Sequence, residues 1–62
     1  VGVSREYTIE PQIKRAGDRW VLTLWEDGEP CGGGVFPWAI DRTGFDAGYQ
    51  DALDWGEDWV QS

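Results

Sequence analysis

The pair Asp27-Gly28, with an apolar run on either side, constrains the fold of this chain more than any other feature. Such a pair between two apolar runs is typical of a two-residue β-hairpin turn of type I′. This turn needs positive φ angles at both central residues, which Asp tolerates and Gly adopts freely. The sequence therefore predicts two antiparallel strands, over residues 19–26 and 30–36.

The hairpin turn also predicts the register of these two strands. Trp25 then lies opposite Pro30, and Leu24 lies opposite Cys31. Side chains alternate along a strand, so one face of the hairpin is expected to carry Trp20, Leu22, Leu24, Cys31, Gly33 and Val35. The other face is expected to carry Val21, Thr23, Trp25, Pro30, Gly32 and Gly34.

Residues 32–34 are all glycine, which is unusual inside a strand. Two interpretations remain open: either Trp side chains lie across the glycines, or another backbone or a ligand approaches closely there. Cys31, beside this run, has no basic neighbour in the sequence that would activate its thiol. We interpret it as a small core residue rather than as a reactive group.

A first strand is predicted over residues 6–15, because Tyr7, Ile9 and Ile13 share one parity of the alternation. Pro11 cannot donate a hydrogen bond to a neighbouring strand, so this strand is expected at an edge of the sheet, or interrupted at that point. Residues 1–4 are expected to form a loose end.

An amphipathic helix is predicted over residues 44–60. Thr43 followed by Asp46 resembles a capping box in which Asp replaces Glu. Apolar and small residues then recur at spacings of three and four, namely Phe45, Gly48, Tyr49, Ala52, Leu53, Gly56, Trp59 and Val60. The C-terminal end of this helix is acidic, which opposes the helix dipole, so we expect it to fray or to meet a basic partner.

Together these elements predict an α+β fold. It is a three-stranded antiparallel sheet with one C-terminal helix packed on one face, in the order β-β-β-α. Sixty-two residues make one small domain, residues 1–62, and a domain of this length buries only about 60% of the surface of its unfolded chain.

The composition argues against most kinds of catalysis. The chain has no histidine and one cysteine, which excludes Ser-His and Cys-His pairs, a Cys/His zinc site and a disulfide within the chain. We therefore predict a protein that is not an enzyme, with no catalytic residues, no metal and no cofactor. The single cysteine, with no apparent export signal, favours the cytoplasm.

The charge narrows the choice of partner. The formal net charge is −7, from 12 acidic and 5 basic residues, which disfavours direct binding to nucleic acid and to anionic membranes. The sequence also has no apolar run long enough to span a bilayer. A protein partner or a homodimer is therefore expected.

Two surfaces could contact such a partner. The first is the sheet face that one helix leaves uncovered, with Val21, Thr23, Trp25, Phe36 and Trp38. The alternative is that the chain is an acidic inhibitor, an antitoxin-like regulator or a nucleic-acid mimic. It would then occupy a basic site on its partner through the acidic helix face, formed by Asp46, Asp51, Asp54, Glu57 and Asp58.

The order of elements is similar to the small β-β-β-α unit of HicB-type antitoxins, in which a short sheet precedes an acidic helix. Residues 7–11 and 51–54 are the parts that look similar. The Pro-Asp-x-Pro-Gly-like segment expected in the third strand of that family is missing, and residues 31–36 stand in its place. The resemblance is one of architecture, and on it we assign the chain to no family.

Overall fold

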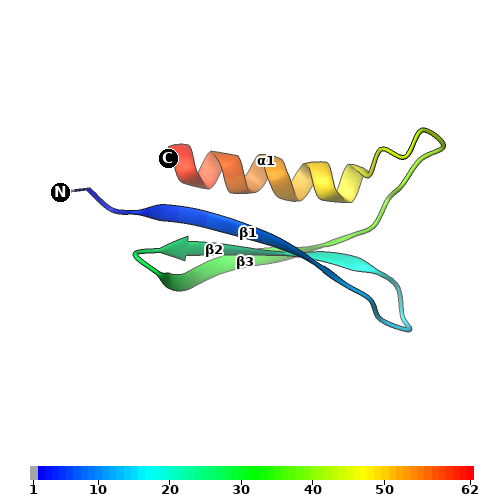
Figure 1. The fold of residues 1–62 in the computed structure, drawn as a ribbon, viewed down its shortest axis with the longest axis horizontal. Helices are drawn as coiled ribbons and strands as arrows, with labels where there is room; N and C mark the ends of the chain where they lie inside the picture. Colours follow the sequence, from blue (N-terminus) through cyan, green and yellow to red (C-terminus); the bar gives the residue numbers. More distant parts are fainter. Residues whose placement is uncertain (1) are drawn as a thin grey trace.

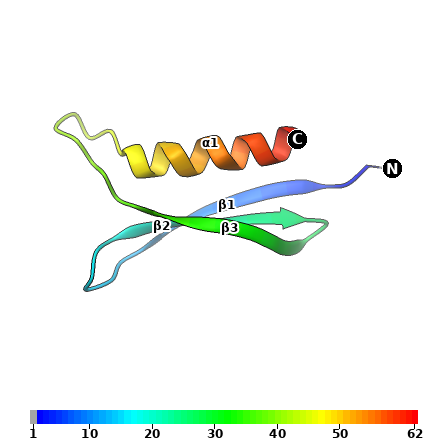
Figure 2. The ribbon, with the colours of Figure 1, turned by 180° about the vertical axis from the view of Figure 1, so that it is seen from behind.

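The computed structural model describes residues 2–62 and confirms the α+β fold in the order β-β-β-α. The strands are β1 (Arg5–Gln12), β2 (Arg19–Glu26) and β3 (Glu29–Pro37). They form one antiparallel sheet with β2 in the centre. The helix α1 (Ala47–Gln61) lies along one face of this sheet, as Figures 1 and 2 show from opposite sides.

The predicted hairpin turn is confirmed. Asp27 and Gly28 have φ angles of 52° and 83°, which are the positive values that a type I′ turn requires. Trp25 pairs with Pro30 on the far side of the turn, as expected. The local chemistry of two residues thus fixes where β2 ends and β3 begins.

The predicted register is wrong beyond this pair. Leu24 pairs with Gly32 instead of Cys31, because a β-bulge leaves Cys31 as an extra residue in β3. A shift by one residue moves every following side chain to the opposite face. Phe36 therefore lies on the helix side of the sheet, and Val35 lies on the side away from the helix.

Both interpretations of the glycine run apply, at neighbouring positions. A Cβ on Gly34 would lie 2.8 Å from the indole ring of Trp55, so an aromatic side chain of the helix does cover this glycine. A Cβ on Gly33 would overlap the main-chain carbonyl group of Leu22. The backbone of β2 thus makes the close approach at Gly33 and requires glycine there, whereas a side chain at Gly34 would displace the Trp55 ring.

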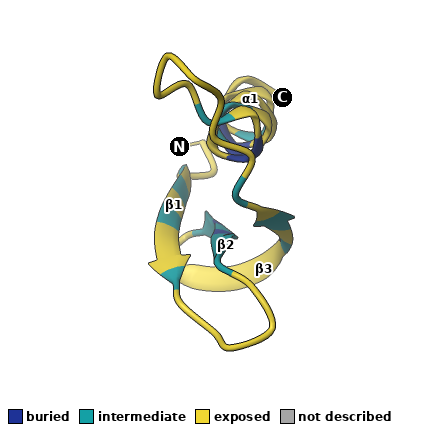
Figure 3. Ribbon diagram, turned by 90° about the vertical axis from the view of Figure 1, so that its right-hand side faces the viewer, coloured by how far each residue is buried: buried dark blue, intermediate teal, exposed yellow. Residues whose placement is uncertain are grey.

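The core is small and lies between the helix and β2. Its buried apolar residues are Leu22, Leu24 and Ala52, and Figure 3 shows how few residues are buried. Partly buried side chains surround them, namely Tyr7, Ile9, Phe36 and Trp59. Glycine at position 56 lets the helix come close to the sheet, since a Cβ there would lie 2.5 Å from the ring of Tyr7.

The helix begins later than predicted, and its N-cap is Asp46 rather than Thr43. The Asp46 side chain accepts hydrogen bonds from the main-chain N–H groups of Gly48 and Tyr49. The main-chain N–H of Thr43 instead donates to the carboxylate of Asp41, in a turn before the helix. The capping box therefore does not form, because Asp46 is itself the cap.

Candidate interaction surfaces

The sheet face without the helix has an apolar centre. Val21, Thr23 and Trp25 lie there as predicted, each half-buried, and Val35, which pairs with Val21, is 55% exposed. The indole N–H of Trp25 donates to the hydroxyl of Thr8 at 3.1 Å, which fixes the ring against β1. We call these four residues, Val21, Thr23, Trp25 and Val35, the open face.

The two sides of the open face differ in charge. On the β1 side, Glu6 and Glu10 lie opposite Trp25 and Val21. On the β3 side there is no charged residue after Glu29. A hollow of about 280 Å³ lies at the end of the open face, beside the β1–β2 turn. It is lined by Ala16, Gly17, Asp18, Arg19, Val35 and Pro37.

The other two residues predicted on this face lie elsewhere. Phe36 is on the helix side because of the bulge, and its ring meets that of Trp55 edge to face at a centroid distance of 5.6 Å. Trp38 stacks on Trp20 at 5.2 Å. Its main-chain N–H donates to the carbonyl of Asp18 at 3.1 Å, which continues the ladder and turns Trp38 to the helix side.

Asp46, predicted as part of the acidic helix face, is occupied within the fold. Its carboxylate accepts hydrogen bonds from the indole N–H of Trp20 at 2.7 Å and from the main-chain N–H of Ala39 at 2.9 Å, besides the helix N–H groups. Partial burial raises the pKa of the Asp46 carboxyl. The hydrogen bonds from Ala39, Trp20 and the helix together outweigh burial, so its pKa lies below the ordinary value.

The other residues predicted on the acidic helix face differ in whether they contact the rest of the fold. Glu57 accepts a hydrogen bond from the hydroxyl of Tyr7 at 3.1 Å. Burial of the ring, followed by the hydrogen bond to Glu57, raises the pKa of Tyr7 above its ordinary value. Asp51, Asp54 and Asp58 are exposed, and the helix between them carries no basic residue. These three carboxylates form the acidic surface that the fold leaves open.

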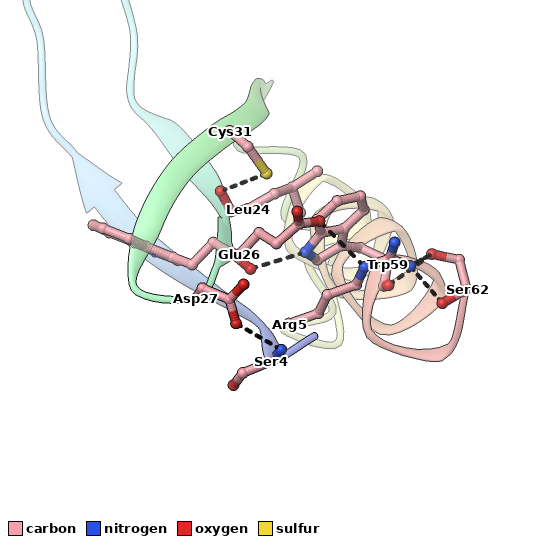
Figure 4. A network of polar contacts seen from close by, with 9 residues as sticks. Ser4, Arg5, Leu24, Glu26, Asp27, Cys31, Trp59 and Ser62 are labelled. Atoms are coloured by element: carbon pink, nitrogen blue, oxygen red, sulfur yellow. Dashed lines mark hydrogen bonds and ion pairs between the residues drawn. The ribbon is translucent and has the colours of Figure 1, made fainter. Parts of the chain in front are cut away.

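The C-terminal end of the helix is held by Arg5 of β1 (Figure 4), a residue that we did not predict for this role. Its guanidinium group donates to the hydroxyl of Ser62 at 2.7 Å and to the Ser62 main-chain carbonyl. It also lies 4.5 Å above the ring of Trp59 and forms an ion pair with Glu26 at 3.5 Å. Arg5 thus supplies the positive charge that the helix end lacks in sequence.

Cys31 is exposed, so its interpretation as a core residue is wrong. Its sulfur lies 3.6 Å from the main-chain carbonyl oxygen of Leu24, beside the bulge (Figure 4). Among residues 2–62, no three His, Cys, Asp or Glu side chains are grouped as they would be to hold a metal ion. Over the same residues, no helix has the length and apolar character needed to cross a membrane.

Comparisons with protein families, with curated proteins and with solved structures find no match to this chain. The function is therefore inferred from the surfaces described above.

Proposed function

We propose that this chain is a small, non-enzymatic protein-interaction module that binds its partner through the open face. The observation that supports this most is the exposed apolar centre of the sheet on the side opposite the helix, where Val35 is 55% exposed beside Val21 and Trp25. An apolar patch on a small domain commonly marks a binding surface. A tryptophan held in place by a hydrogen bond, as Trp25 is by Thr8, is a suitable anchor for such an interface.

The proposed partner is a protein, either another chain or a second copy. The net charge of −7 repels phosphate groups, so direct binding of nucleic acid or of an anionic membrane is not part of the proposal. A single cysteine fits a reducing compartment such as the cytoplasm, which is where we propose that the module acts.

The test compares Trp25→Ala with Val60→Ala, which removes an apolar side chain that is 41% exposed on the helix. Both variants and the unchanged chain are used to capture proteins from an extract of the source cells, and thermal unfolding checks that each one folds. We expect Trp25→Ala to lose at least tenfold in recovery of a specific partner while Val60→Ala retains it. Equal recovery by all three proteins would contradict the proposal.

A second candidate function rests on Asp51, Asp54 and Asp58, which are exposed on a helix without basic residues. As an inhibitor or mimic of nucleic acid, the chain would place these carboxylates in a basic site. Such binding falls steeply with ionic strength, whereas binding by the open face does not. Charge reversal by Asp54→Lys and Asp58→Lys abolishes binding in this case and leaves it intact if the open face is the interface.

A further inference from the structure

The hydrogen-bonding direction of the β3 residues after the bulge follows from one contact at the end of the strand. The Trp38 N–H donates to the Asp18 carbonyl, in the same register as the β2–β3 pairs, so this is a hydrogen-bonded pair. Such pairs alternate with non-bonded pairs along an antiparallel ladder. The main-chain groups of Gly33 and Val35 therefore point away from β2, towards the free edge, and Pro37, which has no N–H, occupies the next outward position.

This free edge carries no charge. From Pro30 to Ile40 every residue is uncharged, although acidic and basic residues make up 27% of the chain. Two exposed aromatic or aliphatic side chains flank the edge: Val35 on the open face, and Trp55 on the helix side, 48% exposed and lying over Gly34. An uncharged edge strand with apolar residues on both faces is a template for pairing with another strand.

The chain also exposes more surface than a free-standing domain of its mass. For a 7.0 kDa chain the typical folded area is about 4,000 Å², whereas this one has 4590 Å². Its radius of gyration is 12.9 Å, against roughly 10.5 Å for a compact domain of this length. The excess area, on the order of 600 Å², approaches the roughly 800 Å² that each partner buries in a standard interface.

We propose that β3 pairs antiparallel with β3 of a second copy of this chain, around a twofold axis at Gly34, and so forms one continuous six-stranded sheet. In this register Gly33 of each copy lies opposite Val35 of the other. The outward N–H and carbonyl groups of both residues are then satisfied by reciprocal hydrogen bonds. The pairing ends at Pro37, which offers no further donor.

The glycine at the axis suits this arrangement. Gly34 meets Gly34 of the second copy in a non-hydrogen-bonded pair, where the backbones approach most closely, to about 4.5 Å between Cα atoms. Trp55 lies over Gly34 in each copy, so the two exposed indole rings come together above the axis. On the other side of the sheet, the open faces of the two copies become neighbours.

The strand that pairs with this edge is β3 of a second copy, because the edge of β3 is complementary to itself. Each chain carries a charge of −7, so two copies associate only where neither presents carboxylates, and the segment from Pro30 to Ile40 is such a region. At the outer edge of the paired sheet, Glu6 and Glu10 of β1 remain far from the axis. A basic strand from another protein would form no ion pair here, because no acidic side chain lies beside Gly33 and Val35.

The test is the native mass in solution, from micromolar to millimolar concentration, by light scattering behind a sizing column. We expect the mass to rise from 7.0 kDa to twice that value. Val35→Pro removes only an outward N–H and keeps the bonds to β2, so it is expected to stay monomeric with a nearly unchanged melting temperature. Val35→Ala keeps the N–H and is expected to dimerise. A monomeric unchanged chain, or a dimeric Val35→Pro, would overturn the proposal.

If Val35→Pro fails to fold, spin labels on Cys31, the only cysteine, carry the test. Each Cys31 lies three residues from the axis, so the two Cα atoms of a β3-paired dimer are roughly 20 Å apart. A distance distribution without a population near this value would contradict the pairing. Trp25→Ala distinguishes the two proposals. If the dimer is lost in Trp25→Ala but kept in Val35→Pro, the copies associate through the open face. In that case the pairing of β3 is contradicted and the proposed function is not.

Discussion

The strands β1 and β3 both lie at an edge of the sheet and pair only with β2, but their edges are built differently. β1 carries Arg5, Glu6 and Glu10, and Pro11 removes one of its outward N–H groups. Beyond Glu29, β3 has no charge. Charges, prolines and bulges are the usual means of keeping an edge strand unpaired. On β3 the prolines and the bulge lie only towards its two ends, so the difference indicates that β1 is protected along its length and that the segment 32–36 of β3 is not.

The helix strengthens this contrast. It contacts β1 more extensively than β3: Gly56 lies against the ring of Tyr7, and Arg5 binds the helix end. The first turn of the helix contacts the end of β3, where Gly48 lies against the Pro37 carbonyl. Over the middle of β3 the cover is the ring of Trp55, which is itself 48% exposed. On the helix side, the middle of β3 is thus less covered than β1.

The largest effect is expected from Gly33→Ala, which disrupts the docking of β3 itself. The new Cβ would overlap the Leu22 carbonyl, and β3 can relieve this only by moving its backbone. We expect a loss of about 3 kcal/mol in the free energy of unfolding, out of a total on the order of 5 kcal/mol for a domain of this length. Chemical denaturation followed by tryptophan fluorescence measures it.

Gly32→Ala is the matched control, because its Cβ meets only the Leu24 side chain, at 3.8 Å. Its free energy of unfolding should stay within about 1 kcal/mol of the unchanged chain. Similar losses for Gly32→Ala and Gly33→Ala would mean that β3 does not depend on the close approach at Gly33.

Gly56→Ala examines the β1 side in the same way. Alanine favours the helix by about 1 kcal/mol over glycine, but the methyl group would press on the ring of Tyr7, which costs about 2 kcal/mol. We therefore expect a net loss of about 1 kcal/mol in the same denaturation experiment. Asp58→Ala, at an exposed helix position, is the control and should be neutral. A stabilised Gly56→Ala would show that the helix is not held closely against β1.

Acid should weaken the helix through Asp46. Its pKa is lower in the folded chain than the ordinary value near 3.9, so the unfolded chain takes up the proton more readily. The stability that Asp46 contributes is complete above the unfolded-state pKa and is lost as the pH falls through the folded-state pKa. Asp46→Asn keeps an N-cap without this titration. On acidification, the melting temperature of the unchanged chain should therefore fall by a few degrees more than that of Asp46→Asn. Melting temperatures that fall equally with pH in the two proteins would contradict this.

The smallest effect is expected from Pro11→Val, which restores an outward N–H on β1. Because the charges of Glu6 and Glu10 remain on that strand, we expect no increase in native mass relative to the unchanged chain. Its free energy of unfolding should change by less than about 1 kcal/mol, as is usual at an exposed strand position. A variant that forms larger assemblies would show that Pro11 alone protects this edge.

The features of the fold that depend on residues adjacent in the sequence could be predicted from the sequence. Asp27-Gly28 identified the hairpin turn, and Pro11 identified an edge strand. The bulge at Cys31 was missed, because the register there depends on contacts that Gly33 and Gly34 make with other elements, and these exist only in the folded chain.

Contacts between distant parts of the chain also account for the residues that we misplaced at the candidate surfaces. We predicted Thr43 as the cap from sequence, whereas the contact between the Asp46 carboxylate and Trp20, distant in the chain, helps to select Asp46. Phe36 changed face with the bulge. Arg5 meets the helix end only because β1 and α1 lie side by side, so no sequence pattern near residue 60 could indicate it.

Amide hydrogen exchange, measured by NMR at increasing protein concentration, tests the contrast between the two edges most directly. The outward amides are those of Gly33 and Val35 on β3. On β1 they include those of Tyr7 and Ile9. The Asp27 N–H donates to the Ser4 carbonyl, and the alternation along β1 follows from this pair. We predict that Gly33 and Val35 gain protection as concentration rises, while Tyr7 and Ile9 continue to exchange rapidly. Equal exchange at both edges at every concentration, or protection gained only on β1, would contradict the account.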